Sequence, residues 1–240
     1  LELYFQSTRG GGSGAADLWV STRNTAIDNW GVATNLGATV NSVSQDHAAT
    51  ISNDGLTLIF ASDRIGGFGN LDLYMITRPT LSGAWSAPVN LGGVINTQFI
   101  GRSPEISTDG LSLYFHSDVP GGFGVTDLYV STRASILDPW EPSINLGGVV
   151  NSPESDGAPE IASDGLSFYF HSTRTGGPGL LNIWRTTRAS VNDAWAAPEV
   201  LPMPINSTSS ELAPSLSDDW QTLYFTSDVG GNRDIWQAVP

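Results

Sequence analysis

The sequence predicts an all-β fold made of repeated four-stranded antiparallel sheets, and three observations carry this prediction. An aromatic triplet recurs every 55 residues, a Trp, an Asn and an Asp keep the same step, and the segments between them show no helical periodicity. The 240 residues include 27 Gly and 14 Pro, with only 14% charged residues, which is typical of a turn-rich β protein. Such sheets must stack on one another to bury both faces, which predicts a β-propeller.

The repeat is specific because four features stay in register. The triplet occupies 3–5, 58–60, 113–115, 168–170 and 223–225. The same step relates Trp30, Trp85, Trp140 and Trp195, then Asn41, Asn96, Asn151 and Asn206, and then Asp54, Asp109, Asp164 and Asp219. We therefore predict one propeller domain over residues 1–240, with repeats 1–54, 55–109, 110–164, 165–219 and a partial repeat 220–240.

One unit illustrates the four predicted strands, named A to D from the central channel outward. They are expected at 103–107 (A), 111–117 (B), 127–132 (C) and 143–146 (D). An Asp-Gly turn joins A to B, and a Gly-rich loop joins B to C. Strand B alternates apolar and polar residues, as a half-buried strand does.

The number of strands bears on how the ring closes. The first unit begins at strand B and the last ends after strand C, so five blades would leave the first without A and the fifth without D. The alternative is four blades, closed by pairing the last A, B and C with the first D, which would leave residues 1–22 outside and expose Leu18 and Trp19. We favour five blades. Their incomplete ends would permit self-association through an unpaired strand edge.

The N-terminal residues belong to this repeat. The segment Leu3–Ser7, followed by glycines, resembles a protease-cleavage scar with a linker, but residues 7–23 align without gaps to residues 172–188. We treat them as part of the fold. With neither an initiator Met nor a signal peptide, the chain is expected to be a processed product or a fragment.

Charge and composition exclude several classes of function. The chain has 24 acidic and 10 basic residues, all of the latter Arg, and a formal net charge of −14. Such a protein repels nucleic acid and anionic membrane surfaces. It has no apolar run of about 20 residues, so we expect no membrane insertion. Because Cys is absent, disulfides, thiolate metal sites and a cysteine nucleophile are excluded.

The repeat resembles a known family. Its pattern, S-x-D-G-x-x-L-Y-F-x-S-D-R-x-G-G-x-G-x-x-D-L-Y-x-S-T-R followed by W-x-x-P-x-N-L-G, is similar to the TolB-like β-propeller repeat of bacterial exported and envelope proteins, a WD-repeat-like bacterial propeller. The resemblance covers essentially the whole chain. It implies the propeller fold, protein or ligand binding, and a periplasmic or extracellular location.

Residues repeated in every blade are interpreted as architecture. The Asp-Gly corners are turns, since no cluster of carboxylates has the spacing of a calcium loop. The Gly-rich loops precede strands, whereas a phosphate loop opens a helix. Capping or inter-blade pairing is assigned to Asp17, Asp72, Asp127 and Asp234 and to Arg23, Arg78, Arg133 and Arg188. The repeated Trp residues are interpreted as packing anchors rather than as a sugar-stacking platform.

Positions that differ between blades are the better candidates for a binding site. Where the D–A loops enter strand A, and just below, the candidates are Asp46, His47, Arg102, Glu105, Asp156, Glu160 and Glu211. We predict that they converge at an acidic channel mouth that binds a protein or peptide, with cationic partners favoured. The other interpretation is a solvated acidic funnel without a ligand.

Two further possibilities concern metal and catalysis. His116 and His171 occupy equivalent positions in neighbouring blades, and with a carboxylate they could hold a divalent metal, although polar filling between blades is the favoured interpretation. No Gly-x-Ser-x-Gly elbow is present. We therefore predict a non-enzymatic binding scaffold with no cofactor beyond a divalent cation at the channel. The alternatives are a carbohydrate-binding or glycoside-hydrolysing propeller, with Glu105 and Glu160 as its carboxylates, and a purely structural segment of a larger envelope protein.

Overall fold

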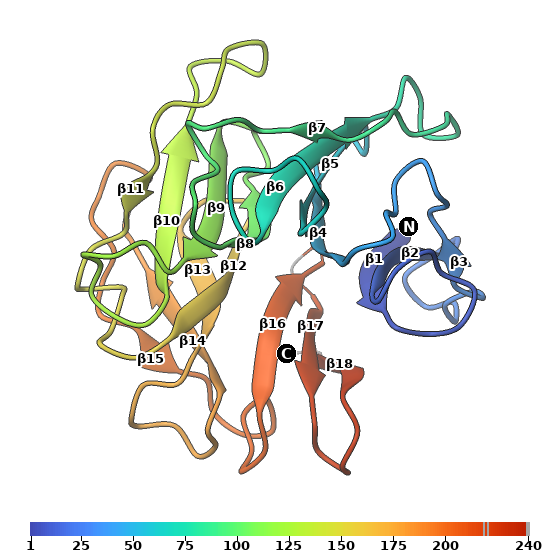
Figure 1. Ribbon diagram of the computed structural model, residues 1–240. Coiled ribbons are helices and arrows are strands. Elements are labelled where there is room, and N and C mark those ends of the chain that lie inside the picture. The colour runs from blue at the N-terminus through green and yellow to red at the C-terminus, as the bar shows by residue number, and fades with distance from the viewer. Residues whose placement is uncertain (218, 220, 239–240) are drawn as a thin grey trace. The chain divides into compact units, whose positions relative to one another are not determined.

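The computed structural model describes residues 1–217, 219 and 221–238, and its regular elements are all strands (Figure 1). In chain order they are β1 (Glu2–Ser7), β2 (Asp17–Thr22), β3 (Thr34–Asn35), β4 (Asp46–Ile51), β5 (Thr57–Ser62), β6 (Asp72–Thr77), β7 (Val89–Asn90), β8 (Gly101–Ile106), β9 (Ser112–Ser117), β10 (Asp127–Thr132), β11 (Ile144–Asn145), β12 (Asp156–Ile161), β13 (Ser167–Ser172), β14 (Asn182–Thr187), β15 (Glu199–Val200), β16 (Glu211–Leu216), β17 (Leu223–Ser227) and β18 (Asp234–Ala238). Nowhere in the described residues is there a helix long and apolar enough to cross a membrane.

The strands form five sheets, and the chain is a five-bladed β-propeller. The blades are β1-β2-β3, β4-β5-β6-β7, β8-β9-β10-β11, β12-β13-β14-β15 and β16-β17-β18. The four-bladed alternative is wrong, because β1 and β2 form a sheet of their own with β3. As the strand count predicted, within the described residues the first blade has no strand A and the fifth has no strand D.

The chain divides into two compact units, Leu1–Pro104 and Glu105–Pro240, which are described one at a time. In each, apolar side chains from strands B and C of successive blades pack together with a Val of the D–A loop, and in the second unit Ile161 of strand A joins them. The first unit buries Leu18, Val40, Leu58, Phe60, Tyr74 and Ile76, and the second buries Tyr114, Leu128, Val150, Ile161, Phe168, Phe170 and Trp184. Burial of Leu18 and Trp19 confirms that the N-terminal segment belongs to the fold.

A buried asparagine in each D–A loop completes the hydrogen bonding of strand C. Oδ1 of Asn41 accepts a bond from the N–H of Leu18 at 2.8 Å, and its Nδ2 donates to the Leu18 carbonyl at 3.0 Å. The same pair of bonds joins Asn96 to Leu73, Asn151 to Leu128 and Asn206 to Ile183. Strand D has only two residues in each of the four blades that contain it, and the residue after it donates its N–H to the same carbonyl of strand C. The asparagine amide adds the partner that the N–H of strand C otherwise lacks.

An aspartate at the start of strand C fixes the B–C loop. Asp72 accepts hydrogen bonds from the N–H groups of Phe68 and Gly69, at 2.5 and 3.2 Å, and from Nδ2 of Asn90 at 2.9 Å. Equivalent contacts are made by Asp17 and Asp127. The capping role predicted for these three residues is confirmed.

The fourth blade changes both members of this contact together. Asn182 stands in place of the Asp, and Val200 stands in place of the Asn that would donate to it. Asn182 instead accepts from the N–H of Gly179 and donates to its carbonyl, at 3.1 and 2.9 Å. In the fifth blade Asp234 is exposed. The paired replacement indicates that this contact serves the fold.

The arginine after strand C holds the A–B turn of its own blade. Nε of Arg78 donates to the Gly55 carbonyl at 2.7 Å, and its guanidinium lies 4.5 Å from the ring centroid of Trp85. Arg133 and Arg188 make the same contacts with Gly110 and Trp140 and with Gly165 and Trp195. Arg78 also forms an ion pair of 2.7 Å with Glu2 of the preceding blade. Capping and inter-blade pairing are both observed.

We predict that replacing Asn151 by Ala lowers the free energy of unfolding by about 2 kcal/mol, because it leaves the buried N–H of Leu128 without its partner and leaves the Leu128 carbonyl with the N–H of Leu146 alone. Urea denaturation measures the change. The matched control is Asn192→Ala, an exposed position, which should change stability by less than about 0.5 kcal/mol. Equal effects of the two variants would contradict the role given to the buried asparagine.

Candidate functional site

The first residue of strand A is a buried carboxylate in three blades. In the second blade Asp46 accepts hydrogen bonds from the N–H and Oγ of Ser42, at 2.5 and 2.9 Å, and forms an ion pair of 2.5 Å with Arg64. In the fourth blade Asp156 does the same with Ser152 and Arg174, and its ion pair measures 2.6 Å. Both carboxylates therefore fold the D–A loop onto the B–C loop of their own blade.

The other two complete strands A vary this contact. Glu211 accepts from the N–H and Oγ of Ser207, at 3.0 and 2.6 Å, and from the hydroxyl of Ser227. In the third blade Gly101 takes the acidic position, and Val119 takes the position of the arginine. The third blade thus lacks both the acid and the arginine, whereas the fifth blade keeps the acid with Val229 at the arginine position.

These contacts narrow the predicted binding set. Asp46, Asp156 and Glu211 are each 0–1% exposed, and their carboxylate oxygens are bonded inside the protein. A ligand would have to displace those bonds to reach them. The candidates whose side chains could still contact a ligand are then His47 and Arg102 in the first unit and Glu105 and Glu160 in the second. Convergence of all seven residues at one mouth stays a prediction.

In the first unit, His47 is buried, and the nearby charge of Arg102 affects its pKa. The His47 ring is 3% exposed, and its Nδ1 is buried with no hydrogen-bond partner. Burial and the positive charge of Arg102 lower the pKa of His47 to about 4, against the opposing effect of Asp63 and Asp46. Arg102 itself is exposed. A neutral imidazole therefore lies beside an accessible cation at the start of strand A.

Glu105 and Glu160 occupy equivalent positions in strand A of the third and fourth blades. Glu160 is 7% exposed, and its Oε1 accepts a hydrogen bond of 2.8 Å from the N–H of Leu216. This bond ties β12 to β16 of the next blade. Glu105 is half-buried. A carboxylate used for glycoside hydrolysis has to reach the scissile bond, and the backbone contact holds Glu160 in a structural position instead.

The two other histidines support a β-bulge that recurs in strand A. The third residue of each strand A has a positive φ of 47–53° (Ala48, Ser103, Ala158 and Ala213). Nδ1 of His116 accepts a bond of 3.3 Å from the N–H of Ala158, and Nδ1 of His171 accepts one of 3.4 Å from Ala213. In the first unit Oε1 of Gln6 receives the N–H of Ala48 at 3.1 Å. Polar filling between blades is confirmed.

This packing leaves little room between the two imidazole rings. Their centroids are 6.3 Å apart, and a Cβ added at Gly157 would lie 2.8 Å from Nε2 of His171. Across the described residues, no three His, Asp or Glu side chains are grouped so that they could hold a metal ion. The divalent cation expected at the channel stays a prediction.

Exposed aromatic residues on the B–C loops were missed by the sequence reasoning. Phe68 and Phe123 occupy the same repeat position in the second and third blades and are 55% and 54% exposed. Each ring lies over a glycine of the adjoining D–A loop, where a Cβ would come within 3.2 Å of Phe68 at Gly93 and 2.6 Å of Phe123 at Gly148. The sequence did carry a signal for them, because the first and fourth blades have Ser13 and Pro178 at this repeat position and only the second and third have an aromatic residue there.

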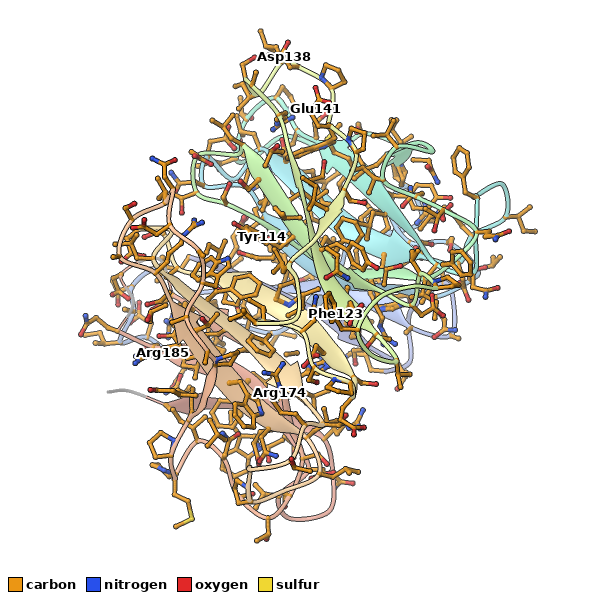
Figure 2. The ribbon with its side chains drawn as sticks, turned by 90° about the vertical axis from the view of Figure 1, so that its left-hand side faces the viewer. Tyr114, Phe123, Asp138, Glu141, Arg174 and Arg185 are labelled. Atoms are coloured by element: carbon orange, nitrogen blue, oxygen red, sulfur yellow. The ribbon has the colours of Figure 1, made fainter. Side chains whose placement is uncertain are left out.

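We use the term loop face for the end of each blade that carries the B–C and D–A loops. Within the second unit, Figure 2 shows Phe123 at this end of its blade, and Asp138 and Glu141 on the C–D loop at the other end. Val94 and Val149, which directly follow the two glycines, are 50% and 58% exposed. Each of these two blades therefore presents a small apolar patch on its loop face.

Comparison with known proteins relates this chain to several solved propellers. No protein-family model and no curated protein matches the sequence. TolB from Acinetobacter baumannii has a TM-score of 0.63 at 14% identity, covering 99% of this chain and 50% of that one. The endo-arabinase from Bacteroides thetaiotaomicron VPI-5482 gives 0.63 at 12%, covering 100% and 94%. The α-L-arabinofuranosidase from Lactobacillus brevis gives 0.60 at 13%, covering 99% and 86%.

These similarities concern the fold. At such identities the chain shares its propeller architecture both with TolB and with glycoside hydrolases. It spans about half the length of the TolB structure from Acinetobacter baumannii. The predicted resemblance to TolB-like propellers is thus supported for the fold, while no family model confirms the specific repeat family.

We predict that His47 binds its proton near pH 4, whereas the unfolded chain binds it near pH 6.5. Protonation then favours the unfolded state, so this histidine should lower the free energy of unfolding by about 3 kcal/mol as the pH falls from 6.5 to 4. NMR titration of the ring measures the pKa. The neutral variant His47→Gln should lose this part of the pH dependence, and a measured pKa above 6 would contradict the environment described.

Proposed function

We propose that the chain is a non-enzymatic scaffold that binds a protein or peptide through the loop faces of its second and third blades. The observation that carries the proposal is the exposure of Phe68 and Phe123 at one repeat position, each on a D–A loop glycine. Exposed aromatic side chains that are backed by rigid structure are typical anchors of protein interfaces. Both loops are held by the buried Asp72 and Asp127, so the anchors are preorganised.

Polar groups at the same ends of the blades would give this face its specificity. In the first unit the N–H of Gly101 donates to the Leu71 carbonyl at 2.8 Å, which brings the start of β8 to the end of the loop that carries Phe68. Arg102, the next residue, is exposed and could bind a carboxylate or a carbonyl of the partner. Apolar and polar contacts would then be combined on one blade end, as in protein interfaces.

The overall charge suggests which partners would meet this face fastest. A net charge of −14 attracts cationic surfaces and raises association rates at low salt. We therefore expect a partner that is basic overall, and an association rate that falls as salt is added. A periplasmic or extracellular location, implied by the resemblance to TolB-like propellers, completes the proposal.

Carbohydrate binding or hydrolysis is the second candidate, and the fold shared with an endo-arabinase and an α-L-arabinofuranosidase favours it. Against it stands the backbone bond that occupies Glu160. Asp46, Asp156 and Glu211 are likewise bonded within their loops. Binding of a polypeptide requires no free carboxylate and is therefore the proposal that agrees better with these contacts.

We predict that a phage-displayed library of random peptides yields sequences that bind the full chain and that Phe68→Ser and Phe123→Ser each weaken their binding about tenfold. The control is Leu137→Ser, which removes a side chain that is 92% exposed on a C–D loop. That variant should bind like the unaltered protein. Selection of no peptide, or equal losses in all three variants, would contradict the loop-face proposal.

We predict further that the full chain releases no reducing sugar from arabinan and shows no binding on a glycan array. Should turnover be found, Glu105→Gln and Glu160→Gln decide its origin, because the Gln amide oxygen can still accept the Leu216 N–H while losing acid–base chemistry. Activity that both variants abolish would establish the carbohydrate candidate and overturn the present one.

A further inference from the structure

At three junctions between successive blades, the bulge of strand A donates a hydrogen bond to a side chain of the preceding blade. The acceptors are Gln6 for the N–H of Ala48 at 3.1 Å, His116 for that of Ala158 at 3.3 Å and His171 for that of Ala213 at 3.4 Å. All three acceptors are the fifth residue of a strand B. They receive an N–H group that the shift of register at the bulge leaves outside the pairing of strands A and B.

The junction between the second and third blades has no such acceptor. Ala61 is the fifth residue of β5, and its methyl group cannot accept a hydrogen bond. The bulge residue of the third blade is Ser103, whose φ of 50° matches those of the other three bulges. The N–H of Ser103 therefore meets no acceptor at the position that provides one elsewhere. Both residues lie within the first unit.

His47 brings a polar atom without a partner to the same junction. It is the cross-strand neighbour of Ala61 in the antiparallel pair of β4 and β5, and neighbours of this kind project from the same face of a sheet. Its ring is 3% exposed, and Nδ1 forms no hydrogen bond with any described residue. A buried polar atom of this kind is rare in a folded protein and often marks a functional site or a bound group.

Arg102 begins beside Ala61. At the equivalent position of the next blade, a Cβ added to Gly157 would lie 3.2 Å from Nδ1 of His116, and His116 is the equivalent of Ala61. By the same repeat, the Cβ of Arg102 lies close to the Ala61 methyl group. Arg102 directly precedes Ser103 and is exposed, so its guanidinium is accessible at this junction.

Arg102 is also the charge best placed to attract an anion to this junction. After burial, its charge has the largest effect on the pKa of His47, which it lowers, and this effect exceeds the opposing one of either Asp63 or Asp46. The two carboxylates are engaged elsewhere. Asp46 forms an ion pair within its own blade, and Asp63 accepts the N–H and Nε2 of Gln45 at 2.7 and 3.2 Å.

We infer that the junction between the second and third blades binds a carboxylate group, in the place that an acceptor side chain takes at the other three junctions. One carboxylate oxygen accepts the N–H of Ser103, and the guanidinium of Arg102 pairs with the charge. The ring of His47 donates from Nδ1, in the tautomer that carries its proton there. Because His47 and Ala61 are buried, the exposed Arg102 is the group that the ligand meets first.

Charge and size favour a single carboxylate over other anions. A carboxylate has acceptors only and is smaller than the imidazole that the next two blades carry at the position of Ala61. A dianion such as phosphate would be repelled more strongly by the net charge of −14. Two sources offer the group, a free organic acid and the C-terminus of a polypeptide. The inference does not need the apolar anchors Phe68 and Phe123, so either proposal can fail without the other.

The test titrates the full chain, labelled with ¹⁵N, with propionate and with N-acetyl-dialanine, and it follows the NMR shifts of the Ser103 amide and the His47 ring nitrogens. We expect saturable shifts that Arg102→Gln weakens about tenfold, because a charge-assisted hydrogen bond is lost. The dipeptide with an amidated C-terminus should cause no saturable shift. Tighter binding of the dipeptide assigns the site to a polypeptide C-terminus, and tighter binding of propionate assigns it to a free acid.

Three further variants test whether the carboxylate binds at this junction. Ala61→Gln restores the acceptor found at the equivalent position of the first blade, so it should abolish binding while circular dichroism shows an unchanged fold. Arg233→Gln removes the same charge at another exposed position, and Phe123→Ser alters a loop face, so both should leave binding unchanged.

Three results would overturn the inference. They are the absence of saturable binding by both acids, equal binding of the amidated dipeptide, and equal weakening by Arg102→Gln and Arg233→Gln. If Ala61→Gln does not fold, the comparison of the two arginine variants decides alone.

Discussion

The fold depends on one side-chain interaction, the pair of hydrogen bonds between an asparagine amide and the first apolar residue of strand C. Strand D is only two residues long, and without Asn41 the buried N–H of Leu18 would have no partner, while its carbonyl would keep only the N–H of Leu36. The asparagine side chain donates and accepts hydrogen bonds of the kind that the backbone of a longer strand D would make. The same asparagine holds the D–A loop in place. Because this loop leads into strand A of the next blade, the contact fixes both strand C and the position at which the next blade begins.

Most charged residues of the chain are explained by these loops. Asp46 and Asp156 bind loop amides and an arginine, Asp72 binds the B–C loop, and Arg78 binds a turn and a tryptophan. A protein with few charged residues uses them largely to satisfy backbone groups that short strands leave open. Chemistry that recognises a partner is then left to the residues that vary between blades.

The 55-residue repeat predicted the fold well, because a constant repeat length shows which strand follows which in every blade. It also predicted the two incomplete blades. It placed Asp46, Asp156 and Glu211 correctly at the start of strand A but could not show that their side chains turn inward, since their partners lie up to 18 residues away. Phe68 and Phe123 break the repeat, but the sequence pattern does not show that their side chains are exposed in the folded loop.

The bonds between neighbouring segments recur at constant separations, 18 residues for Asp46 and Arg64, 23 for Leu18 and Asn41, and 42 for His116 and Ala158. A chain that is cut at equivalent points of two repeats and rejoined there would therefore keep each kind of hydrogen bond. Unequal recombination within such a gene changes the number of blades and keeps the hydrogen bonds between neighbouring repeats. For the same reason one whole repeat, with its distinctive loop residues, can be exchanged for another in protein engineering.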